Sequence, residues 1–328
     1  MQTNIISIHL LNILDNMKID NFFTSYSTEE SCKLYFKSQR EAAGIICSKC
    51  ENNTHYWIES LSRWQCKKCR KSVTLKSGTV MENSNLSYKI WLWSLYFTTL
   101  TKKGFSALEL QRLVGHKRYE PIWGLMQKVR VVMGRRDEKY ELDGFIEMDE
   151  GFFEGHRKKA EEGLITIQAK ELDRQVKAIV AVSTTPIETG ECKKGRPVTK
   201  PGYLKISVVQ SLSKIDIGYE AEKMIAKSSE VKTDGKTSYR TLNDICKNHT
   251  EIVIKDKKEV TKIFPWVHIA ISNAKKKILG LHHSVKDSYM QNYLNEFCYK
   301  FNRRYFGIKL FDRLMVAGIS SAWYKPCT

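Results

Sequence analysis

The stretch CSKCENNTHYWIESLSRWQCKKC at residues 47–69 contains two C-x2-C pairs with fifteen residues between them. The pairs are Cys47 with Cys50 and Cys66 with Cys69. This spacing is typical of zinc sites, because two tight turns that each present two thiolates complete a closed tetrahedral coordination shell. The sequence therefore predicts a structural Zn²⁺ held by four cysteines.

Two other uses of these cysteines stay open. One is a pair of disulfides, although the total of nine cysteines is odd and we expect no secretory signal. The other is a redox C-x-x-C, although neither pair lies in a thioredoxin-like context. For the remaining five cysteines we expect ordinary buried thiols: Cys32, Cys192, Cys246, Cys298 and Cys327.

Short strands are expected around the second pair, at His55–Ile58 and Arg63–Cys66. Aromatic residues would cover a core too small to be stable alone. In zinc-finger peptides the metal supplies about 10–16 kcal/mol of apparent folding free energy. The predicted element is therefore a zinc ribbon, over residues 44–77.

Basic residues gather on the second half of this ribbon. From Arg63 to Lys76 there are six basic residues and no acidic one. Unopposed cations on a rigid ribbon favour phosphate binding, and a solvated charged surface is the alternative. The candidate nucleic-acid-binding residues are Arg63, Lys67, Lys68, Arg70 and Lys71.

The whole chain is also basic. Its 328 residues include 54 Lys and Arg against 36 Asp and Glu, which gives a formal net charge of +18. Such a charge points to a polyanionic partner, nucleic acid before an anionic membrane, and a merely basic soluble protein is the other reading. With 42% hydrophobic residues, the composition excludes a wholly disordered chain.

No membrane-spanning segment is expected. The longest apolar stretches, Ile5–Leu14 and Ile90–Leu100, are shorter than the ~18 residues that a span needs. The first also lacks the basic flank and cleavage site of a signal peptide. We therefore expect a soluble protein without a membrane partner, cytoplasmic, or nuclear if the host is eukaryotic.

Helical patterns are predicted on both sides of the ribbon, in an N-terminal segment over residues 1–43 and a second segment over residues 84–140. In the first, Ser27–Glu30 is a plausible helix start, and in the second Ser87–Leu100 reads as an apolar helix.

Two further helices follow within the second segment. Ser106–Glu109 has the pattern of a capping box, and the helix that it opens is expected to end near Val114, with Gly115 as the breaker. Another helix runs from Glu120 to Met133. The pair resembles a DNA-binding helix-turn-helix, although any helical hairpin has a similar pattern.

From Gly144 the sequence changes to strands mixed with helices, which indicates an α/β domain with helices against a sheet. The expected strands are Gly144–Phe153, Val176–Val182, Tyr203–Gln210, Glu230–Thr233 and Glu251–Ile254. The expected helices are Gly218–Lys227, Tyr239–Lys247, Val267–Leu279 and Lys286–Tyr305. Basic loops are expected at His156–Arg174 and Glu191–Pro201.

Two aspartates near expected strands are closely followed by a glycine: Asp149 by Gly151 and Asp234 by Gly235. Such a residue can present a carboxylate into a cleft, and it is equally common as a turn former. A third element, His268, follows Asp234 and opens a helix.

This order of elements resembles the transposases of insertion-sequence family 1595, the zinc-ribbon-bearing, ISXO2-like branch of the Asp-Asp-Glu (DDE) transposases. The resemblance rests on the ribbon, the helical segment, Glu147–Glu150, Thr233–Gly235, Gly280–His283 and the run NEFCYKFNRR at Asn295–Arg304, and it covers about residues 25–310.

The resemblance implies an α/β fold class, with an RNase H-like catalytic domain over residues 144–310 behind the ribbon and the helical segment. It also implies a DNA transposase that binds the terminal inverted repeats of its element, cleaves there and joins the 3′ ends to target DNA. Such enzymes act as homo-oligomers that synapse two ends.

One position departs from most of the family. His268 stands where the third carboxylate is usual, twelve residues before Gly280, and the lysine expected seven residues later is Lys275. This pattern is similar to an Asp-Asp-His subgroup. Asn273 is the alternative third ligand, and a structural hydrogen bond is the alternative role of His268.

The implied chemistry uses two Mg²⁺ or Mn²⁺ ions. Asp149 would bridge both ions, Asp234 would hold one and His268 the other, while Lys275 would reach a phosphate or stay solvated. Glu147 shares the strand face of Asp149 and is a candidate supporting residue only. Glu150 points to the opposite face of a regular strand and is left out of the catalytic set.

Two other functions remain open. One is a zinc-ribbon DNA-binding regulator with an inactive RNase H-like domain, which only the histidine at 268 supports. The other is an RNase H-like nuclease acting on junctions or RNA–DNA hybrids, which would need neither a ribbon nor a helical module.

Overall fold

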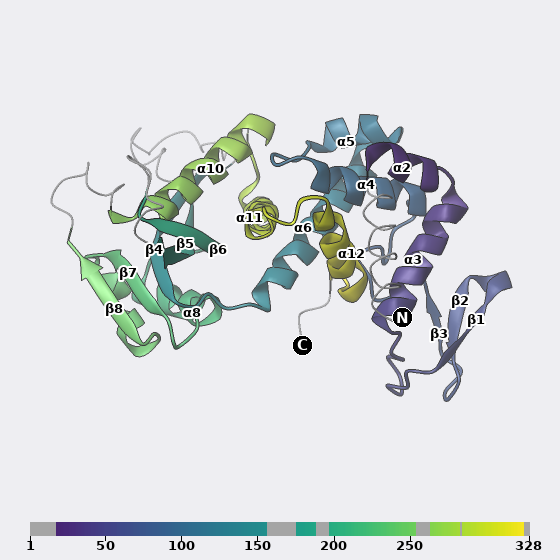
Figure 1. Cartoon of the computed structure of the whole chain (residues 1–328), viewed down its shortest axis with the longest axis horizontal. Helices are drawn as coiled ribbons and strands as arrows, with labels where there is room; N and C mark the ends of the chain where they lie inside the picture. Colours follow the sequence, from purple (N-terminus) through teal and green to yellow (C-terminus); the bar gives the residue numbers. More distant parts are fainter. Residues whose placement is uncertain (1–17, 156–174, 188–196, 254–262, 283, 325–328) are drawn as a thin grey trace, which may run out of the picture. The chain divides into compact units, whose positions relative to one another are not determined.

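The computed structural model describes residues 18–155, 175–187, 197–253, 263–282 and 284–324 (Figure 1). Packing divides the chain into two compact units. Unit 1 ends at Arg135 and resumes at Arg303, and unit 2 runs from Arg136 to Asn302. The four-part domain division expected from the sequence stays a prediction.

The ribbon in unit 1 is a three-stranded antiparallel sheet in the order β1-β2-β3. Its strands are β1 His55–Ile58, β2 Arg63–Cys66 and β3 Ser72–Thr74, and a short 3-10 helix, η1 Glu59–Leu61, joins the first two. The first two strands agree with the sequence-based expectation. The ribbon's buried core contains only Ile45, Trp64, Val73 and Leu75 among the described residues, so it needs support from outside.

Helix α3, Glu29–Ala43, supplies part of that support. Arg40 Nη1 donates to the carbonyl oxygens of Thr74, Leu75 and Ser77 at 3.0, 2.9 and 2.7 Å. Glu41 accepts a hydrogen bond from Trp64 Nε1 at 3.2 Å. These bonds tie the helix to strand β3 and to the ribbon's core.

The remaining helices of unit 1 are α2 Ile19–Ser25, α4 Tyr88–Leu100, α5 Ala107–Val114, α6 Tyr119–Glu138 and α12 Leu310–Ser320, with a 3-10 turn η3 Gly307–Lys309 before the last. Helices α2, α3, α5 and α12 pack against α4. Phe22 stacks on Tyr96 with ring centroids 3.7 Å apart, and Phe311 of α12 meets both rings edge-on. Helix α12, which the sequence patterns did not predict, thus completes an aromatic core.

Unit 2 contains a mixed sheet of five described strands in the order β6-β5-β4-β7-β8. Strands β4, β5 and β6 are antiparallel neighbours, whereas β7 and β8 run parallel to β4. The strands are β4 Phe145–Glu154, β5 Gln175–Pro186, β6 Thr199–Val209, β7 Glu230–Asp234 and β8 Asn248–Ile252.

Helices cover both faces of this sheet. One core joins the sheet to α10 Pro265–His282 and α11 Asp287–Asn302. The other joins it to α8 Lys214–Met224 and the 3-10 helix η2 Thr237–Asp244. Three antiparallel strands extended by parallel ones, with helices on both sides, form the α/β architecture expected of an RNase H-like domain, so the predicted fold class is confirmed.

Two expectations about local structure were wrong. The helix expected at Tyr239–Lys247 is the 3-10 helix η2, which spans Thr237–Asp244 and therefore begins two residues earlier and ends three residues earlier. The loop expected at Glu191–Pro201 overlaps β6, which tolerates Pro201 because it is an edge strand. Residues 1–17, 156–174 and 188–196 lie outside the described part of the chain.

Within the described residues, no helix is both long enough and apolar enough to cross a membrane.

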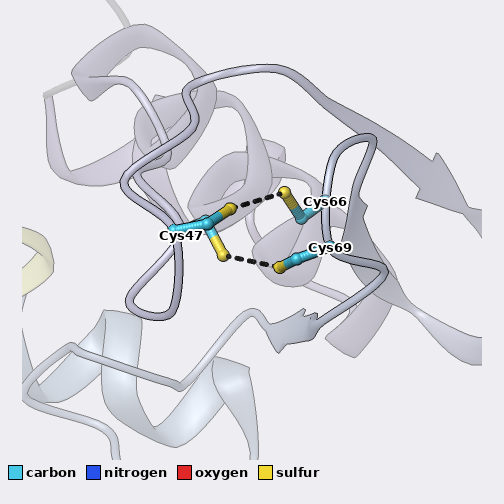
Figure 2. Close-up of side chains that lie close together, drawn as sticks. Cys47, Cys66 and Cys69 are labelled. Carbon is cyan, nitrogen blue, oxygen red and sulfur yellow. Dashed lines mark hydrogen bonds between the residues drawn. The ribbon is translucent and has the colours of Figure 1, made fainter.

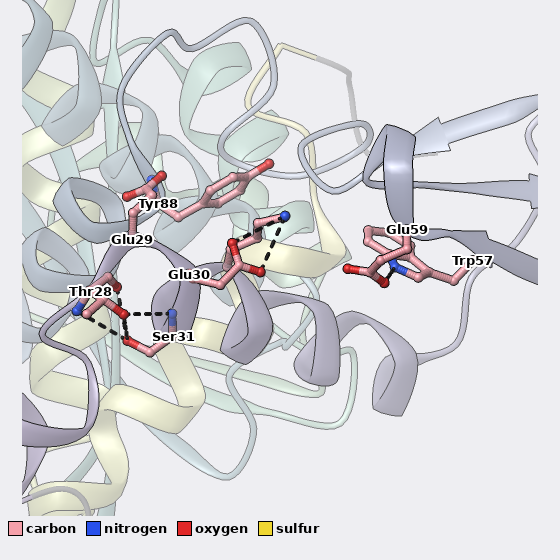
Figure 3. Close-up of polar contacts among 8 residues, drawn as sticks. Thr28, Glu29, Glu30, Ser31, Trp57, Glu59 and Tyr88 are labelled. Carbon is pink, nitrogen blue, oxygen red and sulfur yellow. Dashed lines mark hydrogen bonds and ion pairs between the residues drawn. The ribbon is translucent and has the colours of Figure 1, made fainter.

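Side chains at two neighbouring helix starts satisfy exposed backbone N–H groups (Figure 3). Thr28 and Ser31 form a capping box on α3. The carboxylate of Glu29 accepts from the backbone N–H groups of Tyr88 at 2.7 Å and Lys89 at 2.9 Å, the first turn of α4. One carboxylate therefore holds two helix N-termini together, which the positive end of each helix favours.

Replacing Glu29 by alanine should destabilise the protein, because two N–H groups of α4 lose their acceptor. We expect the free energy of unfolding to fall by about 1–2 kcal/mol. Glu30→Ala is the matched control, since Glu30 makes only a surface ion pair with Lys33 at 3.4 Å, and should change it by less than about 0.5 kcal/mol. Urea unfolding of both variants measures the difference, and equal losses would contradict the capping role.

Candidate functional site

The four ribbon cysteines converge on one point. Cys47 Sγ lies 3.4 Å from Cys69 Sγ, and Cys50 Sγ lies 3.6 Å from Cys66 Sγ. All four sulfurs lie within 4.8 Å of one another, and Figure 2 shows Cys66 and Cys69 facing Cys47 across the gap. These separations are too long for disulfides, of about 2.05 Å, and fit a tetrahedron of thiolates about 2.3 Å from Zn²⁺.

The two cysteine turns have the same backbone shape. Glu51 N–H donates to the carbonyl of Cys47 at 2.8 Å, and Arg70 N–H donates to that of Cys66 at 3.1 Å. Glu51 and Arg70 both have left-handed backbones, with φ of 56° and 62°. Each turn therefore aims its thiols inward, as a closed structural metal site requires.

Hydrogen bonds prepare two of these thiols to ionise. Burial opposes ionisation of Cys66, but the backbone N–H groups of Cys69 and Lys68 and the amide of Asn52 donate to its sulfur and bring its pKa to about 6. The backbone N–H of Lys49 lowers the pKa of Cys47 in the same way. Thiolates are the form that binds zinc.

The second turn carries exposed cations. Lys67, Lys68, Arg70 and Lys71 are exposed, and we call these four residues the basic knuckle. Arg63, the fifth candidate, is only half-exposed in β2. Lys76 faces inward, because its Nζ donates to the carbonyls of Ser84 at 2.7 Å and Leu86 at 2.8 Å.

A second cluster lies in unit 2, where β4 and β7 run side by side. The parallel register pairs Glu147 with Lys232, so two residues further on Asp149 lies beside Asp234. One carboxylate oxygen each from Asp149, Glu150 and Asp234 lies within 4.8 Å of the others, and we call these three residues the acidic cluster. Three oxygen ligands at this spacing suit a hard divalent cation.

Glu150, which the sequence analysis does not place in the catalytic set, lies close to both aspartates in the structure. Its side chain does point to the opposite sheet face, toward buried Tyr239 of η2. However, Asp234 is the last residue of β7, and Lys236 beyond it contacts the carboxylates of both Glu150 and Asp234. Because β7 ends here, a side chain from the other face reaches the same cluster.

His268 meets the acidic cluster from α10. Its Nε2 lies 3.5 Å from Asp149 Oδ2, is buried and has no hydrogen-bond partner in the described structure. Burial lowers the pKa of His268, so its imidazole is neutral at pH 7 and can ligate a metal. Its ring nitrogens do not lie within 4.8 Å of both aspartates at once.

Glu147 fixes the start of α10. Its buried carboxylate accepts from the backbone N–H groups of Trp266 at 2.8 Å and Val267 at 3.0 Å. Glu147 and Asp149 share one strand face, and His268 directly follows the two anchored residues. The contact of His268 with Asp149 therefore depends on the contact of Glu147 with the helix.

Gly235 allows the tight exit from β7. A Cβ at this position would lie 2.8 Å from Cγ2 of Val253, just after β8. Any larger residue here would have to push aside the exposed side chain of Val253.

The other sequence candidates lie further along α10. Lys275 is exposed and lines a small pocket with Phe152, Glu154 and Gln175. Asn273 is exposed on a face about 140° around the helix from His268, away from the acidic cluster. His282 packs against Tyr293 with ring centroids 4.6 Å apart, and His283 lies outside the described residues.

Burial and crowding perturb the acidic cluster. Burial, together with the charges of Glu150 and Asp234, raises the pKa of Asp149 to about 7, although the backbone N–H of Glu150 donates to it at 2.8 Å. A divalent cation would relieve this repulsion and release a proton. The three carboxylates and the Nε2 of His268, which has no hydrogen-bond partner among the described residues, fit a divalent cation as ligands.

Loss of one ribbon thiol should abolish zinc binding. Cys66→Ala leaves three ligands and an open tetrahedron, so we expect a fall from about one zinc per chain to well below one and a lower melting temperature. Cys246→Ala, which removes a buried thiol outside the cluster, is the control and should retain zinc. Atomic absorption and thermal melting measure both. Full zinc content in the Cys66 variant would rule out the four-cysteine site.

The raised pKa of Asp149 predicts a pH-dependent stability. Without Mg²⁺ or Mn²⁺ and with zinc retained, the folded state holds a proton that the unfolded state releases, so stability falls from pH ~4 to about 7. Asp149→Asn removes this loss. Its melting temperature should exceed that of the wild type at pH 8 and differ less at pH 5. A gap independent of pH would show that Asp149 does not titrate in this way.

Comparison with known families identifies the domain that contains the four ribbon cysteines and the domain that contains the acidic cluster. A family model described as the ISXO2-like transposase domain matches residues 141–302, and one described as the transposase zinc-ribbon domain matches residues 27–72. The second match includes α3, the helix tied to the ribbon by Arg40. No curated protein sequence matches the chain. The chain belongs to the transposases that combine a zinc ribbon with an ISXO2-like transposase domain.

Proposed function

We propose that this transposase binds the terminal inverted repeats of its insertion sequence, cleaves DNA phosphodiesters there and transfers the 3′ ends to target DNA. The observation that carries the proposal is that Asp149 lies beside Asp234 and 3.5 Å from His268 Nε2, although the three residues are far apart in the sequence. This chemistry is what a DDE-type transposase domain implies, and the histidine at 268 supports the Asp-Asp-His subgroup.

The metal-binding roles follow from the contacts. Asp149 lies nearest both other groups, so it would bridge two Mg²⁺ or Mn²⁺ ions, with Asp234 on one ion and His268 on the other. Bound there, the ions would activate the attacking oxygen and stabilise the leaving one. Imidazole prefers Mn²⁺ and later metals to Mg²⁺, so we expect Mn²⁺ to support activity at least as well.

Two further contacts orient this arrangement. Glu147 anchors the N-terminus of α10 and thereby holds His268 against Asp149. Lys275 lies seven residues after His268 on α10, two helical turns along the same face. Its exposed ammonium would bind a phosphate of the DNA end.

DNA binding is proposed for the basic knuckle. Its four cations project from a backbone that two hydrogen-bonded turns make rigid, and the chain carries a net charge of +18. Contacts of this kind weaken with salt, with a log–log slope of about −0.9 per neutralised phosphate. A homo-oligomer that holds two DNA ends in the cytoplasm or nucleus completes the proposal.

One observation favours a second function. His268 replaces a charged ligand by a neutral one, so its set of three offers two negative charges rather than three. A weaker metal site would suit a zinc-ribbon DNA-binding regulator without catalytic activity. Cleavage of DNA separates the two functions.

Manganese-dependent nicking of a labelled duplex that carries the inverted repeat tests the proposal. We expect the wild type to nick it, His268→Ala to lose at least about tenfold in rate, and His268→Glu to retain activity because it restores a carboxylate. Asn273→Ala, a change on the far side of the same helix, should act like the wild type. No nicking by the wild type, with binding intact, favours the regulator, and an unimpaired His268→Ala removes His268 from the site.

A further inference from the structure

Glu150 and Lys236 form an ion pair within the acidic cluster to which the proposed mechanism gives no role. The side chain of Glu150 is 2% exposed, and its Oε2 contacts Lys236 Nζ. Lys236 Nζ also lies 3.3 Å from Asp234 Oδ2, and the backbone N–H of Lys236 donates to Asp234 Oδ1 at 3.3 Å. One ammonium thus bridges two carboxylates of the cluster.

The carboxylate of Glu150 also faces the hydroxyl of Tyr239. Glu150 Oε1 and that hydroxyl are both buried, and within the described residues neither makes a hydrogen bond of good geometry. An unpaired buried carboxylate oxygen is costly, unless a ligand that the protein binds supplies the missing contact. The carboxylate of Glu150 therefore keeps acceptor capacity that a bound cation would use.

We propose that Glu150 is a ligand of the divalent metal, and that Lys236 is the internal counter-ion that the metal displaces from Glu150 and Asp234. The proposal rests on the proposed function, since it assigns further residues to the same site.

The charges explain why the two cations exclude each other. When all three are ionised, as metal binding requires, the carboxylates carry −3 within 4.8 Å, and the Lys236 ammonium reduces this to −2. A divalent ion bound by the same oxygens reduces it to −1 without the lysine, so it compensates the cluster better. An ammonium retained beside the ion would repel it.

The structure leaves Lys236 able to move away. Its side chain is 51% exposed, whereas those of Glu150 and Asp149 are 2% and 17% exposed. The carboxylates are held by the sheet, and the lysine can turn its flexible stem toward solvent. Glu150 also supplies the third negative charge that His268 does not.

Mn²⁺ binding to the full-length zinc-loaded protein, measured without DNA by electron paramagnetic resonance, tests the inference. Glu150→Gln, which keeps the shape but removes the charge, should weaken binding about 10- to 100-fold. Lys236→Met should strengthen it about three- to fivefold, because a half-exposed competing ion pair is lost. In the Glu150→Gln background, Lys236→Met should give a smaller gain, because only the contact of Lys236 with Asp234 is then left to remove.

Lys247→Met is the control, because Lys247 makes a surface ion pair with Glu230 at 3.9 Å, away from the cluster. Thermal melting shows which variants are folded, and Lys236→Met carries the test if Glu150→Gln is not. Unchanged Mn²⁺ affinity in Glu150→Gln, weaker binding in Lys236→Met, or a wild type that binds no Mn²⁺ would overturn the inference.

These outcomes are independent of the proposed function. Normal DNA nicking with unchanged metal affinity in both variants removes Glu150 and Lys236 from the site and leaves the transposase chemistry intact. If the variants show the expected changes in Mn²⁺ affinity but the wild-type protein does not nick DNA, Glu150 and Lys236 keep their proposed roles and the nuclease activity is refuted.

Discussion

The arrangement of the acidic site depends on two hydrogen bonds, in which the buried carboxylate of Glu147 accepts from two backbone N–H groups at the start of α10. A carboxylate inside a protein needs such partners, and the positive end of a helix supplies both donors and a favourable field. Because strand residues two apart share a face, the same contact sets where His268 meets Asp149. One face of β4 therefore sets both the position of α10 and the contact between His268 and Asp149.

The two clusters of metal-ligating residues have different relations to the fold. The ribbon has a core of four buried residues, so four thiolates around zinc, together with Arg40 of α3, would hold it. The sheet of unit 2 has a hydrophobic core on each face. Neither core contains a residue of the acidic cluster, so the sheet can tolerate carboxylates that repel one another at some cost in stability.

That repulsion is the physical signature of the site. Burial and neighbouring charges raise the pKa of Asp149 to about 7, and burial lowers the pKa of His268. Neighbouring groups whose pKa values shift in opposite directions are typical of functional sites, and here they indicate a cation-binding site rather than a stabilising contact. Lys236 compensates part of the charge from a flexible, half-exposed side chain.

Local patterns in the sequence determined the ribbon cysteines, the helix caps at Thr28, Ser87 and Ser106, and most strands. Spacing, capping and alternation act over a few residues, so one sequence suffices to recognise them. Asp149, Asp234 and His268 were found by resemblance to a family pattern. Only the tertiary structure showed that Lys76 faces inward and that α12 packs in the aromatic core. It also showed that Glu150 and Lys236 lie in the acidic cluster. These features depend on the register between β4 and β7 and on where β7 ends, which long-range packing sets and no local pattern encodes.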